Sequence, residues 1–211
     1  MAGLAEPKQE RAVRTREIVM RAAAEVFDEY GYGGASISKI MKRAGVTQGG
    51  MYFHFKSKLG LAEAVMASQQ DFIELPPGED GLQRLIDITA HITHELQHNV
   101  LFRASVRLAV EQEEFGRNDD TAYQEWAERF RVQLVAARAR GELLDDVDEQ
   151  EFSNVLVAAY TGTQIFSTMA SKRADLPERT RTLWRYLLRA IATPSARETL
   201  RLPEAGTGAD T

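Results

Sequence analysis

The sequence predicts an all-α protein, with a small N-terminal three-helix domain followed by a larger helical body. Apolar residues recur at spacings of three and four over most of the 211 residues, which is typical of amphipathic helices. No segment shows the apolar–polar alternation that is typical of a β-strand. Segments rich in glycine and proline divide the helical pattern, and the clearest of them spans residues 75–81.

Nine helices are expected in chain order. In the N-terminal domain Gly45 favours a helix stop, and Ser36, Thr47 and Ser57 are placed to cap the helices that follow them. Later in the chain, Pro177 suits a first helical turn. The expected helices span about residues 13–30, 36–44, 47–55, 57–73, 82–97, 100–113, 126–140, 148–169 and 177–192.

The composition is that of a packed intracellular protein. Residues of the apolar classes make up 44% of the chain, and the absence of cysteine excludes disulfides and thiolate zinc sites. The N-terminus has no apolar signal region, and no apolar run approaches the roughly 20 residues of a membrane helix. We therefore expect a cytoplasmic protein without a membrane partner.

The charge is unevenly distributed along the chain. The formal net charge is −5, yet residues 1–58 carry ten Lys/Arg against six Asp/Glu, so the first part is basic and the remainder acidic. A basic head on an acidic body suggests that only the head contacts phosphate, although chance fluctuation is an equally simple reading.

The most distinctive stretch is residues 47–58, Thr-Gln-Gly-Gly-Met-Tyr-Phe-His-Phe-Lys-Ser-Lys. It follows a short helix and the stop at Gly45, which is the order of a helix-turn-helix motif whose second helix enters the DNA major groove. An ordinary loop whose aromatics belong to the core is the alternative. The expected DNA-binding residues are Ser36, Ser38, Lys39, Arg43, Thr47, Gln48, Gly49, Gly50, Tyr52, His54 and Lys58.

Distinct roles are expected within this stretch. Gly49 and Gly50 allow the backbone to approach the groove closely, and Gln48 can pair with adenine through its amide. The polar tips of Tyr52 and His54 suit phosphate contacts, and so does Lys58 near a helix N-terminus. The apolar residues Met51, Phe53 and Phe55 are expected to pack inward.

These residues resemble the N-terminal domain of TetR-family transcriptional regulators. The resemblance rests on segments 22–27, 30–32, 37–40, 44–47 and 51–58, which occur in the family's order with the family's gaps. It implies that Thr47, Gly49, Tyr52, His54 and Lys58 occupy DNA-contacting positions. Many relatives have lysine where this chain has Gln48, so the operator sequence does not follow from the resemblance.

A second resemblance, in the helical body, narrows the expected function to a subgroup of the family. Residues 101–109 and Trp126 are similar to the γ-butyrolactone-type autoregulator receptors of actinomycetes. The similarity implies a repressor that a γ-butyrolactone or butenolide signal releases from its operator, in control of antibiotic or other secondary metabolism. A TetR-type repressor of a drug-efflux pump is the nearest alternative, and an enzyme or small-molecule carrier with a TetR-like body is a remote one. Neither a catalytic constellation nor a cofactor site is apparent.

The body is expected to hold an apolar ligand pocket. Trp126 could instead be a core tryptophan, and Thr161 and Gln164 could instead bond between helices. Gln69 is on the helix that leaves the head, so a ligand contact there would move the recognition helix. The expected ligand-binding residues are Gln69, Ile88, Ile92, Val106, Val110, Trp126, Phe130, Thr161, Gln164 and Ile165.

The last two expected helices are unusually apolar for terminal helices. Trp184, Leu187, Leu188 and Ile191 on one and Ala158, Gly162 and Thr163 on the other suggest a surface covered by a partner. By resemblance this is a homodimer, which would read a pseudo-palindromic operator. A monomer whose last helices close its own core is the alternative.

Three histidines, His91, His94 and His98, are expected on one helix face. A solvated face is the simpler reading than a metal site. The expected organisation is then a disordered arm at 1–11, a helix-turn-helix domain at 12–56, a ligand-binding and dimerisation domain at 57–194, and a tail at 195–211.

Overall fold

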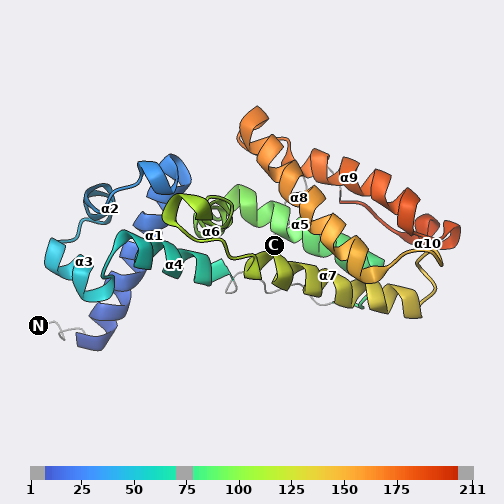
Figure 1. The fold of residues 1–211 in the computed structure, drawn as a ribbon, viewed down its shortest axis with the longest axis horizontal. Coiled ribbons are helices and arrows are strands. Elements are labelled where there is room, and N and C mark those ends of the chain that lie inside the picture. Colours follow the sequence, from blue (N-terminus) through green and yellow to red (C-terminus); the bar gives the residue numbers. More distant parts are fainter. Residues whose placement is uncertain (1–7, 70–77, 204–211) are drawn as a thin grey trace, which may run out of the picture. The chain divides into compact units, whose positions relative to one another are not determined.

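The computed structural model describes residues 8–69 and 78–203, and in these ranges it contains helices but no named strand (Figure 1). The expected all-α class is therefore confirmed. The described residues form two compact units, one made of residues 8–69 and 99–118 and the other of residues 78–98 and 119–203. No helix in the described residues is long and apolar enough to span a membrane.

The first unit packs its helices around α1. Val19 and Phe27 on α1 are fully buried, and Leu61 of α4 and Leu108 of α6 share the same core. Burial of such side chains contributes roughly 1.5–3 kcal/mol each. The elements of this unit are α1 (Lys8–Gly34), α2 (Ile37–Ala44), α3 (Gln48–His54), α4 (Lys58–Ala67), α6 (Val100–Val110) and the 3-10 helix η2 (Gln112–Phe115).

This unit takes in more of the chain than the 12–56 expected from the sequence. Helix α4 packs against both α1 and α6, although the sequence assigned both α4 and α6 to the body. The core explains why: Leu61 on α4 and Ala104 on α6 are both fully buried in the head.

Helix boundaries in this unit differ from the expectation at α1, α4 and α6, and α6 ends at Val110 instead of at about residue 113. α1 begins at Lys8, so residues 8–11 are helical rather than part of an arm, while residues 1–7 lie outside the described residues. α4 ends at Ala67, residues 68–69 form a 3-10 turn, and residues 70–73 of its expected course lie outside the described residues.

The second unit consists of four long helices and a short one. In it α7 packs against α8, and α5 and α8 both pack against α9. Its elements are α5 (Leu82–His98), α7 (Thr121–Ala139), α8 (Glu149–Ser171), α9 (Leu176–Ile191) and α10 (Pro194–Thr199). Helix α10 lies where a tail was expected, because Thr193 accepts a hydrogen bond from Ala196 N and Pro194 occupies the first turn.

A buried hydroxyl network ties three helices of the second unit together. Trp184 Nε1 on α9 donates to Thr89 Oγ1 on α5 over 2.6 Å. Thr93 Oγ1 lies 2.7 Å from Tyr160 OH on α8 and 3.1 Å from Thr180 Oγ1 on α9. Burial raises the pKa of Tyr160, so its hydroxyl keeps its proton and remains a donor.

The same residues correct one expectation about the surface. Trp184, Leu188 and Ile191 are 0%, 7% and 3% exposed, so they cannot form the partner-facing surface that the sequence suggested. They close the unit's own core instead, because Trp184 points toward α5.

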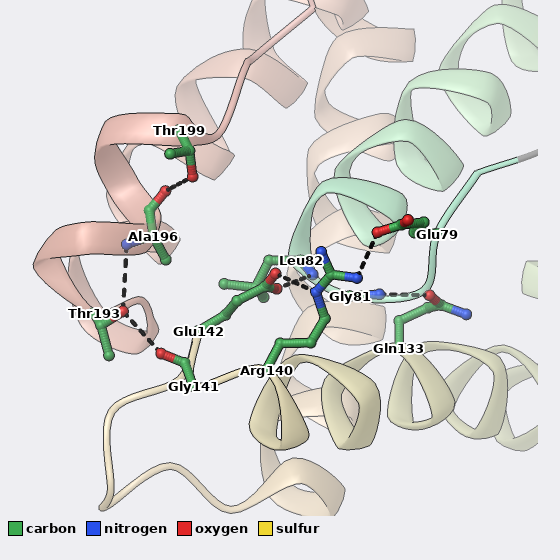
Figure 2. A network of polar contacts seen from close by, with 10 residues as sticks. All are labelled: Glu79, Gly81, Leu82, Gln133, Arg140, Gly141, Glu142, Thr193, Ala196 and Thr199. Carbon is green, nitrogen blue, oxygen red and sulfur yellow. Dashed lines mark hydrogen bonds and ion pairs between the residues drawn. The ribbon is translucent and has the colours of Figure 1, made fainter.

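A polar cluster joins the start of α5 to the end of α7 and the start of α10 (Figure 2). Glu142 Oε2 accepts from Leu82 N over 2.8 Å, and so caps the first turn of α5 from 60 residues away. Gln133 Oε1 accepts from Gly81 N, and Thr193 N donates to the main-chain oxygen of Glu142. These bonds satisfy N–H groups that a helix start leaves unpaired.

Candidate DNA-binding surface

The helix-turn-helix expected at residues 36–55 is present in the first unit. Ser36 Oγ accepts from Lys39 N over 3.2 Å at the start of α2, and Thr47 Oγ1 accepts from Gly50 N over 3.2 Å at the start of α3. Between the helices Gly45 has a φ of 66°, a left-handed conformation in which a side chain is strained. Two short helices are therefore held at a tight turn, with α3 as the second of them (Figure 1).

Helix α3 has one buried face and one exposed face. Met51 is fully buried, and Phe55 at the C-cap is 5% exposed. Gln48 and Gly49 are exposed, as is Tyr52. The structure thus places Gln48 and Gly49 on the outside of this helix, whereas the second expected close-approach residue, Gly50, is half-buried.

The expectation that Phe53 packs inward is wrong. Its side chain is 72% exposed, and its ring meets His54 edge-on with the centroids 4.9 Å apart. The physical reason is helical phase, because residue 53 lies about 200° around the helix from the buried Met51.

The basic side chains beside α3 already have partners within the protein. Arg43 Nη2 lies 2.8 Å from Glu29 Oε2, and this hydrogen bond lowers the pKa of Glu29. Lys39 Nζ donates to the main-chain oxygen of Gly34 and lies 4.0 Å from the centre of the Tyr30 ring. Exposed pairs of this kind contribute little to stability, so a phosphate can replace them at small cost.

Lys58 lies deeper than the sequence suggested. Its ammonium donates to the main-chain oxygens of Tyr32 and Ala35 over 2.8 and 3.1 Å, and lies 4.1 Å from the centre of the Tyr32 ring. It therefore ties the start of α4 to the turn between α1 and α2. Of its three N–H donors, one is left for a phosphate, so a DNA contact by Lys58 stays a prediction.

A set of carboxylates that the sequence reasoning missed holds the end of α1. Glu111 Oε2 accepts from Tyr32 N over 2.9 Å, and Glu114 Oε2 accepts from Gly33 N over 2.7 Å. Arg107 bonds both Glu111 and the main-chain oxygen of Asp28, each over 2.6 Å. The signal in the sequence was the acidic run at 111–114 together with the glycines at 31, 33 and 34.

Gly31 makes this arrangement possible. Its φ is 69°, and a Cβ at this position would lie 2.7 Å from Arg107 Nη2. The main chain of α1 breaks here, so the following N–H groups turn toward the carboxylates of Glu111, at the end of α6, and Glu114, in η2. The turn that precedes α2 is thereby fixed to α6.

The expected ligand-binding residues fall in both units. Gln69, Val106 and Val110 belong to the first, and Val110 is 42% exposed there. Those in the second unit are Ile88, Ile92, Trp126, Phe130, Thr161, Gln164 and Ile165. Whether one ligand meets both sets stays a prediction.

Within the second unit the expected residues differ in burial. Ile88, Ile92 and Phe130 are at most 6% exposed, whereas Ile165 is 37% exposed on α8. The half-buried Trp126 ring lies 5.8 Å from the Phe130 ring.

One buried polar atom on α8 lacks a partner. Gln164 is 4% exposed, and its Oε1 accepts no hydrogen bond within the described structure. A buried amide oxygen without a donor costs free energy, so a hydrogen-bond donor on a bound ligand would be stabilised at this place.

The three histidines lie on α5. His94 and His98 stack with ring centroids 4.3 Å apart, and His98 Nδ1 lies 2.9 Å from the main-chain oxygen of His94. Over residues 8–69 and 78–203, no group of three or more His, Asp or Glu side chains is placed to hold a metal ion.

Comparison with known proteins decides the family. A profile of bacterial regulatory proteins of the TetR family matches residues 19–65, and one of the tetracyclin repressor-like C-terminal domain matches residues 79–193. The chain belongs to the TetR family. The resemblance of the head and the all-α, TetR-like fold are thereby confirmed.

Individual relatives match both parts of the chain. The A-factor receptor protein of Streptomyces griseus is 38% identical over 187 residues, which are 89% of this chain and 67% of that protein. The crystal structure of TylP, a TetR regulator from Streptomyces fradiae, is 38% identical with a TM-score of 0.76, over 90% of this chain and 92% of TylP. A crystal structure described as a γ-butyrolactone receptor (ArpA-like protein) is 26% identical with a TM-score of 0.71, over 89% of this chain and 93% of that one.

As a TetR-family protein, this chain is a DNA-binding transcriptional regulator and not an enzyme. The α2–turn–α3 segment lies inside the matched residues 19–65, and DNA binding by its individual side chains stays a prediction.

Proposed function

We propose that this TetR-family regulator is a repressor that a γ-butyrolactone- or butenolide-type signal releases from its operator, in control of secondary metabolism such as antibiotic production. The observation that carries the proposal is the 38% identity to the A-factor receptor protein, because it extends over 89% of this chain and so includes the variable body. The place of action is then the cytoplasm, where the operator is.

The second unit supports a small ligand of this chemistry. An apolar lining with a few polar groups is typical of small-molecule sites, and the buried side chains of Ile88, Ile92 and Phe130 would supply the apolar part. A lactone ring carrying a hydroxyl could donate to the unpartnered Gln164 Oε1. We propose Trp126 as the aromatic wall of the site.

The decisive measurement is operator release by a defined signal. Full-length protein is bound to labelled duplex from upstream of its own gene, and a synthetic γ-butyrolactone is titrated while fluorescence anisotropy is followed. Release that grows with the added lactone is expected, since a ligand shifts the equilibrium by its differential affinity for the two states. Release by a cationic dye and not by the lactone would instead indicate a drug-responsive regulator of efflux.

A matched pair of variants tests the proposed wall. Trp126→Ala should lose release by the lactone while retaining operator binding, and Trp126→Phe should keep part of it because the ring survives. If Trp126→Ala responds to the lactone as the wild type does, Trp126 does not contact the ligand.

We also propose that the protein acts as a two-fold dimer through α8 and α9. The exposed side of α8 carries Val155, Phe166 and Met169, which are 53%, 59% and 81% exposed, and α9 adds Tyr186 at 63%. Such an accumulation of exposed apolar side chains is typical of a surface that a partner covers.

The dimer is tested by one charge on this surface. Met169→Glu should give a monomer by light scattering and weaken operator binding, because a pseudo-palindrome is then read by one head at a time. Val132→Glu on α7 is the matched control, since Val132 is 46% exposed but on another helix. A dimeric Met169→Glu protein would exclude this face.

A further inference from the structure

Phe53 is an unusually exposed aromatic residue in the first unit. Its side chain is 72% exposed, whereas the other exposed large apolar residues of α1 and α3 reach at most 54%. Phe53 lies on α3, and the two apolar residues on either side of it in the sequence, Met51 and Phe55, are buried. A ring at this position is therefore not needed for the core.

The surroundings of Phe53 leave one side of its ring open. A helical side chain leans over the turn that precedes it, and for Phe53 that turn contains Gly49. Among the described residues other than its chain neighbours, nothing lies within 4 Å of a Cβ built at Gly49, so the backbone is open here. The His54 ring, 4.9 Å away and edge-on, supports Phe53 from one side.

The major groove offers an apolar partner for such a ring. Three of the four bases present only hydrogen-bonding groups there, and thymine adds its C5-methyl group, with which phenylalanine makes apolar contact. On the same helix the amide of Gln48 can bond polar base edges and the hydroxyl of Tyr52 suits a phosphate, and neither of these polar groups recognises a methyl group.

We propose that Phe53 is a specificity-determining residue that contacts a thymine methyl in each operator half-site, beside the open backbone of Gly49. The proposal rests on DNA binding by α3. It adds an apolar reader to the amide of Gln48, so that sequence is read by two kinds of contact.

The size of the contact sets the expected effect. Burial of one methyl group contributes about 0.8 kcal/mol, which is roughly a fourfold change in affinity for each half-site. A site with two symmetric contacts should therefore respond about 15-fold when both methyl groups are removed.

The experiment removes the methyl group alone. Full-length protein selects its preferred duplex from a randomised pool, and each thymine of that duplex is then replaced by deoxyuridine, symmetrically in both half-sites. For the wild type, one symmetric thymine pair should show the loss of about 15-fold. For Phe53→Ala the thymine and deoxyuridine duplexes should bind equally, and a selection repeated with this variant should show no thymine preference there.

Controls separate readout from folding and from general affinity. Phe53→Ala should unfold as the wild type does, because the ring is exposed. Tyr52→Phe should weaken binding to every duplex and keep the thymine-to-deoxyuridine ratio. The proposal is overturned if the wild type has no methyl-sensitive position, or if Phe53→Ala keeps the full sensitivity. If the wild type selects no duplex at all, DNA binding by α3 fails, and this inference fails with it.

Discussion

Substitution of Gly49 by alanine should stabilise the protein and weaken its function. Gly49 is in the first turn of α3, it has no positive φ, and a Cβ there would meet nothing within 4 Å. Alanine is better than glycine in a helix by up to about 1 kcal/mol, so the free energy of unfolding should rise by at most that amount.

Operator binding should change in the opposite direction. An α-helix of about 10–12 Å diameter nearly fills a major groove of about 12 Å width, so a methyl group at the point of closest approach has no free space. Overpacking of close contacts costs typically about 1–3 kcal/mol, which corresponds to a loss of roughly 5- to 150-fold in affinity.

The two effects are measured separately. Unfolding in urea is followed by circular dichroism, because both tryptophans, Trp126 and Trp184, lie in the second unit and do not report on α3. Gly45→Ala is the matched control: its φ of 66° makes alanine unfavourable by about 1–2 kcal/mol, so it should destabilise. A Gly49→Ala protein that binds the selected duplex as tightly as the wild type would refute the reasoning about close approach.

Three further substitutions test the packing of the two units. Glu142→Ala should lower the free energy of unfolding by about 1–2 kcal/mol in tryptophan-monitored urea titrations, because the cap on Leu82 N is lost. Glu142→Gln keeps an oxygen acceptor and should lose less stability. Equal losses in the two variants would contradict a contribution from the bond to Glu142. Glu111→Ala leaves Tyr32 N without its carboxylate and should cost about 1–3 kcal/mol by circular dichroism, whereas Glu113→Ala, at an exposed position, should be neutral. Hydrogen bonds from Ser167 and Ser171, with Arg179, lower the pKa of Asp175 to about 2 from its ordinary 3.8. Because the folded-state pKa is the lower one, this stabilisation is complete above about pH 4 and disappears as the pH falls toward 2. Asp175→Asn should therefore flatten the loss of stability between these pH values, and an unchanged pH profile would show that Asp175 does not contribute.

Much of the fold could be predicted because local signals agree with it. Ser36, Gly45 and Thr47 have the predicted capping and turn conformations, since caps and left-handed stops depend on few neighbouring residues. Helix α8 also begins close to the expected residue 148, because Asp148 caps it by accepting from Glu151 N.

What could not be predicted depends on contacts between distant residues. Periodicity marks an apolar face but does not say what covers it, so Trp184 was assigned to a partner when it bonds Thr89. Phe53 was assigned to the core because the aromatic run was read without its helical phase. The last helix was expected to end at about residue 192 with a tail from residue 195, although Thr193 and Pro194 are also residue types that begin a helix, and here they begin α10.

Because α6 belongs to the first unit, the DNA-binding part cannot be transplanted as the N-terminal segment alone. The head is discontinuous in sequence, because Ala104 and Leu108 of its core come from residues that follow α5. A chain cut after residue 69 would expose the surface of α1 and α4 that α6 covers, and would lose the carboxylates that hold Tyr32 and Gly33. A chimera that transplants this DNA specificity onto another regulator must therefore carry residues 99–118 along with the N-terminal segment, or keep a host helix that reproduces them.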